Sequence, residues 1–216
     1  KECDWSSDVC SSDLWTCEPG CPSTPTYSGR AATASPTLQP PPSPAFSTAA
    51  ACVDHSLPTM SDYEARIAAL LQALGIPDTY GADRQLEPQH EAAELVPVGL
   101  DVFGRAQRLA PAAAHAWKSM RDTAALDGIV LQLVSGFRDV DYQRRLIETK
   151  LARGLHIQKI LASSAAPGFS EHHTGRAIDL TTPGCEPLEE VFERTAAFRW
   201  LEARSAEFGF RLSFPR

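Results

Sequence analysis

The sequence predicts an α+β fold, in which helices pack on a small, mainly antiparallel sheet. Several segments carry apolar residues at the spacing of an amphipathic helix, and short runs with the alternation of strands lie between them. The 216 residues are enough for one domain with a substantial core. We therefore expect one folded domain over residues 60–216.

The first predicted helix covers residues 61–75. Ser61 and Glu64 match a capping box at its start, and Gly75 is a typical helix end. The next twenty residues, 76–95, are rich in turn-forming residues, so we expect them to be irregular.

A helical pattern returns at about Val98 and continues beyond residue 110. Pro111 suits the first turn of a helix, and Gly128 ends that helix. Asp139 can cap the helix that follows it. These and the remaining helical patterns predict helices over residues 111–127, 139–154, 187–209 and part of 157–168.

Three short strands complete the prediction, over residues 129–136, 176–180 and 210–216. Alternation in the second strand places Ala177 and Asp179 on one face and Ile178 on the other. The chain ends just after the third strand begins, so we expect the last strands of the sheet to be missing.

The first 59 residues show neither helical nor strand periodicity. Residues 1–14 include "DWSSDVCSSDL", which matches the translation of a sequencing adapter, and we expect them to be disordered. Residues 15–59 are rich in Pro, Ser and Ala, are also predicted to be disordered, and need not be native. Five of the six cysteines precede residue 60, so no disulfide framework is expected in the domain, for which Met60 is a suitable start.

Charge and hydropathy exclude two classes of partner. The formal net charge of −7 argues against nucleic-acid binding, which needs a basic surface. No run of 18 or more apolar residues exists, so no transmembrane segment is predicted. We expect a monomer.

The segment "SEHHTGRAIDL", residues 170–180, is the candidate functional motif. His172 can offer a ring nitrogen and Asp179 a carboxylate oxygen to one metal ion, provided that the chain turns between them. Thr174 and Gly175 supply such a turn. The competing interpretation is a polar turn with solvent-facing histidines, and by itself this spacing favours the turn.

Three ordered segments resemble the VanY-type D-alanyl-D-alanine carboxypeptidases, zinc peptidases of the LAS group. "SEHHTGRAID" matches the pattern Ser-x-His-x-x-Gly-x-Ala-x-Asp of that family. "SGFRDVDYQ" resembles its Ser-Gly-Tyr-Arg…Gln segment, with Phe137 in place of Tyr, and "FRWLEARSAEFGFRLSFP" resembles its segment near the C-terminus. The resemblance covers residues 100–216 and implies the LAS/Hedgehog-like peptidase fold, with a zinc site on the sheet.

The resemblance implies a role for each matching residue. His172 and Asp179 match two zinc ligands, and Arg138 matches the catalytic arginine that stabilises the oxyanion. The positions that match substrate-binding residues are Gln143, Ser170 and Ser135. Each residue also has a non-functional interpretation. Arg138 would be a surface arginine at a strand end, Gln143 an amide on a helix surface, and Ser135 and Ser170 turn hydroxyls.

The family's Glu-x-x-His segment, which holds the general base and the third zinc ligand, is absent before Arg216. The other histidines, His90, His115 and His156, are expected to face solvent or to be structural, and alternation aims Glu171 away from the site. We therefore expect a C-terminally truncated chain that is inactive as this fragment.

Two functions follow from the resemblance. The first is a zinc-dependent carboxypeptidase that acts on peptidoglycan stem peptides or on precursors ending in D-Ala-D-Ala. The second is a module of peptidase-like fold that binds such peptides without cleaving them. The choice between D,D- and L,D-specificity stays open, as does the location: the absence of a signal peptide favours the cytoplasm, and the substrate class favours the periplasm or cell envelope.

Overall fold

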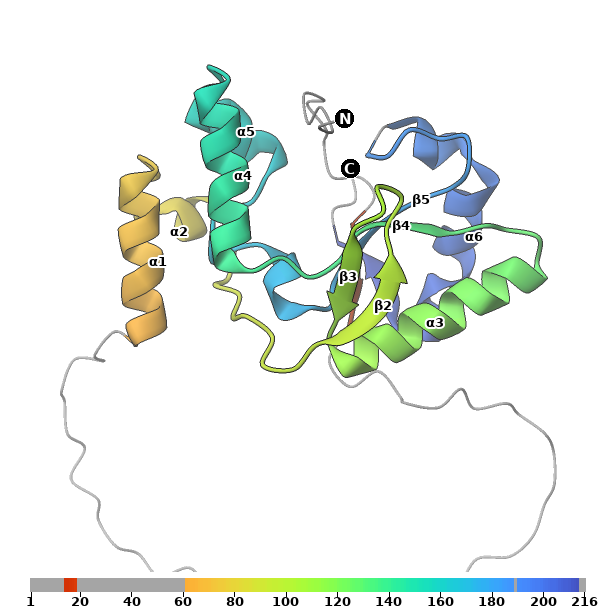
Figure 1. The fold of residues 1–216 in the computed structure, drawn as a ribbon. Coiled ribbons are helices and arrows are strands. Elements are labelled where there is room, and N and C mark those ends of the chain that lie inside the picture. Colours follow the sequence, from red (N-terminus) through yellow and green to blue (C-terminus); the bar gives the residue numbers. More distant parts are fainter. Residues whose placement is uncertain (1–13, 19–60, 189, 214–216) are drawn as a thin grey trace, which may run out of the picture.

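A computed structural model describes residues 14–18, 61–188 and 190–213, and Figure 1 shows how their helices and strands are arranged. The elements are β1 (Leu14–Cys17), α1 (Asp62–Ala73), α2 (Tyr80–Arg84), β2 (Val96–Leu100), β3 (Ala106–Leu109), α3 (Pro111–Leu126), β4 (Gln132–Ser135), α4 (Val140–Ala152), α5 (Ile157–Ser163), the 3-10 helix η1 (Glu171–Thr174), β5 (Ala177–Thr181), η2 (Glu190–Arg194), α6 (Ala196–Arg204), η3 (Ser205–Phe208) and β6 (Phe210–Leu212).

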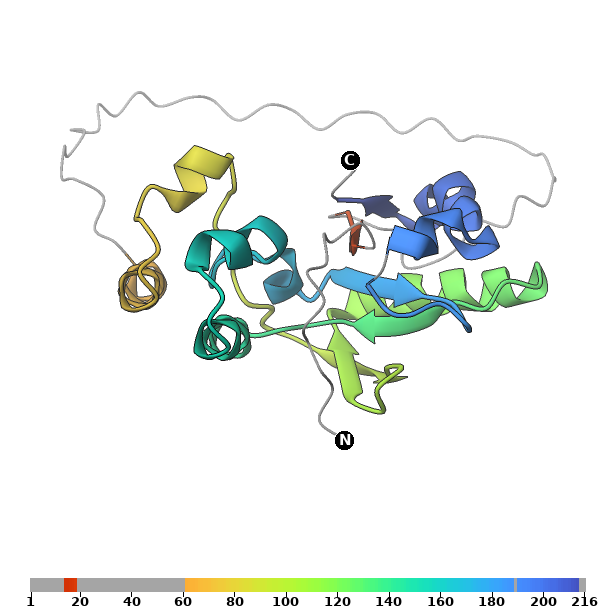
Figure 2. The ribbon, with the colours of Figure 1, turned by 90° about the horizontal axis from the view of Figure 1, so that it is seen from above.

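The main sheet has four strands in the order β4-β5-β1-β6, and each neighbouring pair is antiparallel. A separate antiparallel hairpin joins β2 to β3. Helices α3 and α6 lie at the sheet end of the molecule, and α1, α4 and α5 lie at the opposite end (Figure 2). This arrangement confirms the predicted α+β fold with a small antiparallel sheet.

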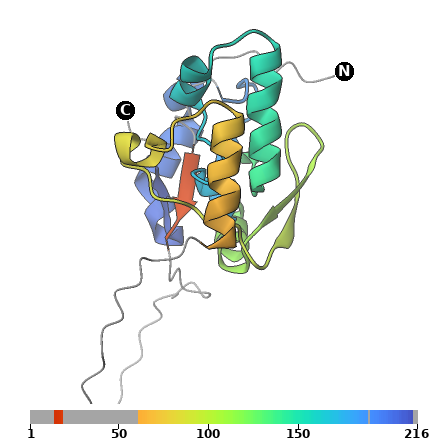
Figure 3. The ribbon, with the colours of Figure 1, turned by 90° about the vertical axis from the view of Figure 1, so that its left-hand side faces the viewer.

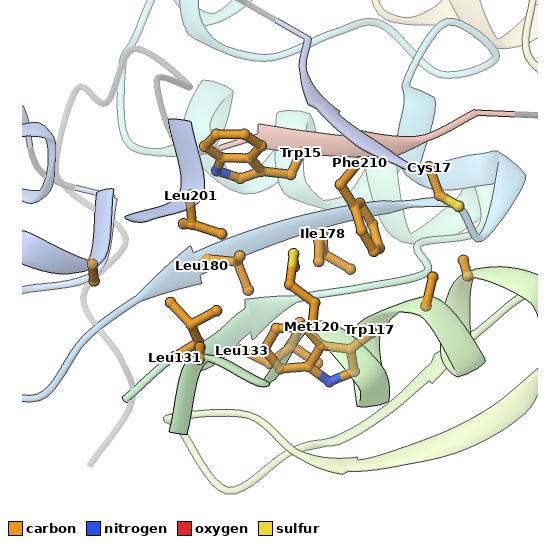
Figure 4. Packing of buried hydrophobic residues seen from close by; sticks show 14 of the residues in the cluster. Trp15, Cys17, Trp117, Met120, Leu131, Leu133, Ile178, Leu180, Leu201 and Phe210 are labelled. Carbon is orange, nitrogen blue, oxygen red and sulfur yellow. The ribbon is translucent and has the colours of Figure 1, made fainter. Parts of the chain in front are cut away.

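The larger hydrophobic core joins the sheet to α3 and α6. Figure 4 shows its side chains in contact: they come from α3, from α6 and from all four strands of the sheet. Trp15, Met120, Ile178, Leu180 and Phe210 each expose 2% of their surface or less. Burial of this much apolar surface is the main force that holds the sheet, and therefore the motif on β5, in place.

A second hydrophobic cluster joins α1, α2, α4 and α5. Ile67 of α1, Tyr80 of α2, Ile147 of α4 and Ile160 of α5 belong to it. Helices α1 and α4 lie side by side, and both are seen end-on in Figure 2 and lengthwise in Figure 3. Among the described residues, no helix has the length and apolar character needed to cross a membrane.

Three predicted helix starts are confirmed, two of them by side-chain hydrogen bonds. At α1 the Ser61 hydroxyl accepts from the Glu64 N–H at 3.2 Å, and the Glu64 carboxylate accepts from the Ser61 N–H at 2.8 Å, which is the predicted capping box. Pro111 is the first residue of α3. Asp139 caps α4 by accepting from the Tyr142 N–H at 2.5 Å.

The helical pattern predicted from about Val98 to residue 110 is wrong. This stretch forms the hairpin of β2 and β3. The Asp101 carboxylate accepts from the backbone N–H groups of Phe103 and Arg105, both at 2.9 Å, and Gly104 adopts a φ of +76°. An aspartate that bonds to the backbone in this way stabilises a turn in competition with a helix.

The single helix predicted over residues 187–209 is also wrong, because the segment is interrupted. The Thr195 hydroxyl accepts from the Phe198 N–H at 3.1 Å, so α6 begins only at Ala196. The 3-10 helices η2 and η3 lie on either side of α6. The stretch 76–95, predicted to be irregular, contains the short helix α2.

The disorder predicted through residue 59 does not hold for Leu14–Cys17. These residues form β1, which pairs with β5 on one side and with β6 on the other. Trp15 and Cys17 belong to the larger core. β1 is therefore held by two buried side chains and by backbone pairing along both of its edges. Residues 1–13 and 19–60, which include Met60, lie outside the described residues.

Candidate metal and substrate site

The motif turns sharply between its two candidate ligands. His172 lies in η1, and Asp179 lies in the middle of β5. Gly175 makes the turn with a φ of +66°, a conformation that favours glycine. As predicted, Ile178 and Leu180 face the core. Because side chains alternate along a strand, Asp179 points away from that core toward His172.

His172 and Asp179 meet in a buried position. The His172 Nε2 atom lies 3.3 Å from the Asp179 Oδ2 atom, and the two residues expose 1% and 3% of their surface. Neither His172 Nε2 nor Asp179 Oδ1 has a hydrogen-bond partner among the described residues. The competing interpretation, a polar turn with solvent-facing histidines, is therefore wrong for His172.

The separation of these atoms fits a zinc ion. Two ligand atoms about 2.0–2.1 Å from a tetrahedral zinc are about 3.3 Å apart. Imidazole nitrogen and carboxylate oxygen are both common zinc ligands. Unpartnered buried polar atoms are costly, so an unpartnered nitrogen and an unpartnered carboxylate oxygen on two residues in contact indicate a position that a ligand fills.

The orientation of the His172 ring is fixed from its other side. Its Nδ1 atom lies 2.6 Å from the backbone oxygen of Gly136. A carbonyl oxygen can only accept, so Nδ1 carries the proton and donates. This leaves Nε2 as the nitrogen that can bind a metal, which is the usual arrangement for a histidine ligand.

Arg138 is held beside this pair by its backbone. Its N–H donates to the His172 carbonyl at 3.3 Å, and its own carbonyl accepts from the His173 ring at 2.6 Å. The buried Nε atom of Arg138 has no hydrogen-bond partner among the described residues. Burial lowers the pKa of the guanidinium, and the nearby Asp179 charge acts in the opposite direction. The alternative interpretation of Arg138, a surface arginine at a strand end, does not fit the burial of its Nε atom.

Asp179 is ionised in this setting. Burial alone would raise the pKa of the carboxyl, but the interaction with the His172 ring and the charge of Arg138 outweigh burial and hold the pKa below its usual range. In the sheet, Asp179 pairs with Ser135 of β4 on one side and with Leu14 of β1 on the other. Directly paired residues project on the same face of a sheet, so Ser135 and Leu14 are its neighbours there.

The three predicted substrate-binding residues lie in different surroundings. Ser135 is buried next to Asp179 in the sheet, and Ser170 is buried immediately before η1. Gln143 lies on α4, where its Nε2 donates to the Ala165 carbonyl at 2.7 Å, and its buried Oε1 lacks a partner among the described residues. The structure thus has Ser135 on the strand that pairs with β5, Ser170 next to η1, and Gln143 against the loop that precedes η1.

His173 is a structural participant that the motif alone did not identify. It is fully buried, its Nδ1 donates to the Arg138 carbonyl, and its Nε2 accepts from the Gly168 N–H at 3.1 Å. Burial lowers the pKa of His173 to about 4, so the ring is neutral at pH 7. The only sequence signal was its position next to His172.

Three other histidines and Glu171 lie outside this pair. His90, His115 and His156 are exposed, as predicted. The Glu171 carboxylate is engaged by other groups, because it accepts from the hydroxyls of Thr16 and Ser213. Within the part of the chain that the structure describes, no three His, Cys, Asp or Glu side chains form a metal-binding group.

Comparison with known proteins places this geometry in a family. The family model described as VanY, D-alanyl-D-alanine carboxypeptidase, matches residues 106–216, which is slightly more than half of the chain. The chain belongs to the VanY family. Both halves of the site, the loop of Arg138 and the motif from Ser170 to Asp179, lie within the matched region.

Two curated VanY-like relatives are similar over this region. The putative carboxypeptidase YodJ of Bacillus subtilis (strain 168) is 35% identical over 106 residues, which cover 48% of this chain and 38% of the relative. The D-alanyl-D-alanine carboxypeptidase of Enterococcus faecalis (strain ATCC 700802 / V583) is 31% identical over 103 residues, which cover 44% and 36%. The chain therefore spans less than two fifths of the length of these relatives.

A solved structure supports the fold assignment. The LdcB LD-carboxypeptidase, whose structure is described as revealing the molecular basis of peptidoglycan recognition, matches with a TM-score of 0.51 and 30% identity. The match covers 59% of this chain and 62% of LdcB. The VanY-family chain therefore shares the LAS-type peptidase architecture predicted from the sequence.

Proposed function

We propose that this VanY-family protein is a zinc-dependent D-alanyl-D-alanine carboxypeptidase that acts on peptidoglycan stem peptides or their precursors. The observation that carries the proposal is a group of three buried polar atoms that lack partners among the described residues: Arg138 Nε, His172 Nε2 and Asp179 Oδ1. His172 and Asp179 are in contact, and the charges of Arg138 and Asp179 influence each other. Perturbed and unsatisfied ionisable groups that occur together in this way are typical of catalytic sites.

The proposed zinc ligands from the described residues are His172 and Asp179. His172 would bind through Nε2, because Nδ1 is engaged by the Gly136 carbonyl, and Asp179 would bind as a carboxylate. Bound zinc supplies Lewis-acid activation of a peptide carbonyl and of water. A third ligand and a general base must come from groups outside this pair.

Arg138 would stabilise the negative charge that develops on the carbonyl oxygen. Its backbone is tied to His172 and His173 by two hydrogen bonds, and its buried Nε has no hydrogen-bond partner among the described residues. A charge that is positioned before the reaction gives more stabilisation than one that must reorganise. Ser135, Ser170 and Gln143 would hold the peptide.

A second function is favoured by one observation. Among the described residues no third ligand or base completes the pair of His172 and Asp179. A domain with only these groups would bind zinc weakly. Such a domain would act as a peptidoglycan-peptide-binding module of peptidase-like fold, without catalysis.

One experiment separates the two functions. The whole chain is incubated with zinc and a stem pentapeptide ending in D-Ala-D-Ala, and released D-alanine, bound zinc and bound peptide are measured. The carboxypeptidase predicts D-alanine release, and we expect Arg138→Gln to lower its rate by about 10²–10³-fold. His172→Ala should remove both zinc and activity.

His115→Ala is the matched control, because His115 is an exposed histidine on α3. It should leave zinc binding and release unchanged. Peptide binding without D-alanine release would favour the binding module, and a chain that binds neither zinc nor peptide would contradict both functions.

A further inference from the structure

We propose that Gln107, oriented by Asp101, is a positioning residue for His172 and Arg138, an inference that rests on the metal-binding role proposed above. Neither residue touches the candidate ligand pair. They act through the backbone of Gly136, and they come from the β2–β3 hairpin rather than from the motif.

The anchor of this arrangement is the Asp101 carboxylate, which is only 6% exposed at the residue level. Its Oδ1 atom accepts from the N–H groups of Phe103 and Arg105, both at 2.9 Å. Its Oδ2 atom accepts from the Arg105 Nε and the Gln107 Nε2, both at 2.7 Å. Four donors, two of them in the backbone of the same turn, hold this carboxylate in one orientation.

Asp101 decides which way the Gln107 amide faces. A carboxylate only accepts hydrogen bonds, so the NH₂ end of the amide must face Asp101. The Gln107 oxygen is thereby directed to the other side, where it accepts from the Gly136 N–H at 3.0 Å. The amide of Gln107 thus connects the hairpin to the loop that follows β4.

The same loop is bound to β3 and to η1. The Phe137 N–H donates to the Arg108 carbonyl at 3.0 Å, next to the contact made by Gln107. The Gly136 carbonyl accepts from His172 Nδ1, and the Arg138 N–H donates to the His172 carbonyl. A Cβ atom at position 136 would lie 3.1 Å from the Arg108 oxygen and 3.2 Å from the Gln107 oxygen, so glycine permits this close approach.

The consequence is a continuous path from Asp101 to the candidate metal position. Gln107 fixes the Gly136 peptide, Gly136 fixes the ring of His172, and the ring places Nε2 3.3 Å from Asp179. Groups that hold the second nitrogen of a histidine ligand set its orientation and its basicity. Gln107 acts one step further out, on the N–H group of the residue whose carbonyl holds the ring.

The test is Gln107→Met, which keeps the length of the side chain and removes both amide bonds. Gln132→Met is the matched control: Gln132 is a glutamine of similar exposure on β4, outside this path. Thermal unfolding establishes that both variants fold. Two properties are then measured on the metal-free whole chain by NMR: hydrogen exchange of the Gly136 amide, and the ¹⁵N signals and exchange of the His172 Nδ1–H.

We expect Gln107→Met to lower the protection of the Gly136 amide by about tenfold, the effect of one ordinary hydrogen bond, and to shift and broaden the His172 ring signals. Zinc affinity, measured by competition with a chromophoric chelator, should fall by about tenfold or more. Gln132→Met should change none of the three. Unchanged protection and ring signals in a folded Gln107→Met variant would overturn the proposal.

Failure of the proposed function would look different. If the wild-type chain bound no zinc, the metal-binding role would lose its support, and the two metal-free measurements would still decide whether Gln107 holds Gly136 and His172. Should Gln107→Met not fold, native-state exchange of the wild-type chain gives the answer: the Gln107 side-chain amide, the Gly136 amide and the His172 Nδ1–H should become exchangeable in one common opening. Independent openings of these groups would contradict the proposal.

Discussion

At the scale of single residues, the two adjacent histidines of the motif have different roles: His172 faces the candidate ligand Asp179, and His173 bonds only to the backbone. His172 directs one nitrogen to the Gly136 carbonyl and the other to Asp179. His173 uses both nitrogens for structure, donating to the Arg138 carbonyl and accepting from the Gly168 N–H. Because its pKa is lowered to about 4, the neutral ring can keep both roles at pH 7. His173 therefore ties the loop of Arg138 to the loop that precedes Ser170.

This division predicts that the stability of the protein depends on the ability of the side chain at position 173 to donate and accept hydrogen bonds, and not on its charge. His173→Leu leaves a buried carbonyl and a buried N–H without partners, and we expect it to lower the free energy of unfolding by about 3 kcal/mol. His173→Gln can donate and accept in the same places, so its cost should be below about 1 kcal/mol. Urea unfolding of both variants measures the difference.

His115→Leu, at an exposed position of α3, is the control and should change the free energy of unfolding by less than about 0.5 kcal/mol. Equal costs for His173→Leu and His173→Gln would show that the two hydrogen bonds of the ring contribute nothing specific.

At the scale of elements, the turn from η1 into β5 decides whether the two candidate ligands can meet. Gly175 has a φ of +66°, and a Cβ atom there would lie 2.9 Å from the Ala110 nitrogen and 3.0 Å from the Leu95 side chain. The Ala110 N–H donates to the Gly175 carbonyl at 2.8 Å. The end of β3 is thus packed directly on the turn between His172 and Asp179.

Gly175→Ala and Gly154→Ala separate backbone strain from close packing. Both positions have positive φ, so each alanine costs about 1–2 kcal/mol in conformational strain. Nothing lies within 4 Å of a Cβ atom at position 154, whereas position 175 is crowded. Gly175→Ala should therefore lower the free energy of unfolding by about 1–3 kcal/mol more than Gly154→Ala does.

Chemical denaturation of the two variants gives this difference directly. Equal destabilisation would mean that the turn has room to adjust, and that its packing against β3 does not fix the positions of the two ligands.

At the scale of the whole molecule, β1 completes the sheet from a distant part of the sequence. It lies between β5 and β6. It also bonds to two residues of the motif: the Cys17 carbonyl accepts from Arg176 Nε at 2.7 Å, and the Thr16 hydroxyl donates to Glu171. Trp15 is 2% exposed within the larger core. A strand in this position stabilises both of its neighbours.

Trp15→Ala measures the contribution of β1. Removal of a buried tryptophan from a packed core costs about 3–5 kcal/mol, so we expect a large drop in the midpoint of thermal unfolding. An unchanged midpoint would show that the fold is stable without this strand between β5 and β6.

The sequence predicted the parts of the fold that depend on local signals. The capping box of Ser61, the proline at the start of α3 and the aspartate cap of α4 act within one helical turn, and each helix appeared where expected. The hairpin of β2 and β3 was missed because the bonds of Asp101 to its own turn outweighed a helical pattern. β1 was missed because its four residues gain stability only from strands more than 150 residues away.

The candidate site divides in the same way. Spacing and resemblance identified His172, Asp179 and Arg138, and the structure brings these three together. The partners that orient them, Gln107 and His173, carried no recognisable motif, since their roles depend on backbone groups that become neighbours only in the folded chain. The substrate contacts of Ser135, Ser170 and Gln143 remain predictions.

The position of β1 also has a consequence for the order of folding. Trp15 pairs with Ile178 and with Leu212, so β1 must wait for the synthesis of both of its neighbours before it can pair. Loop closure over such a distance is entropically costly and makes the formation of the sheet slow. The helical end of the molecule, built from α1, α2, α4 and α5, has its own hydrophobic cluster without β1 and can form earlier. We therefore expect the insertion of β1 beside β5, which completes the sheet around Asp179, to be a late step of folding.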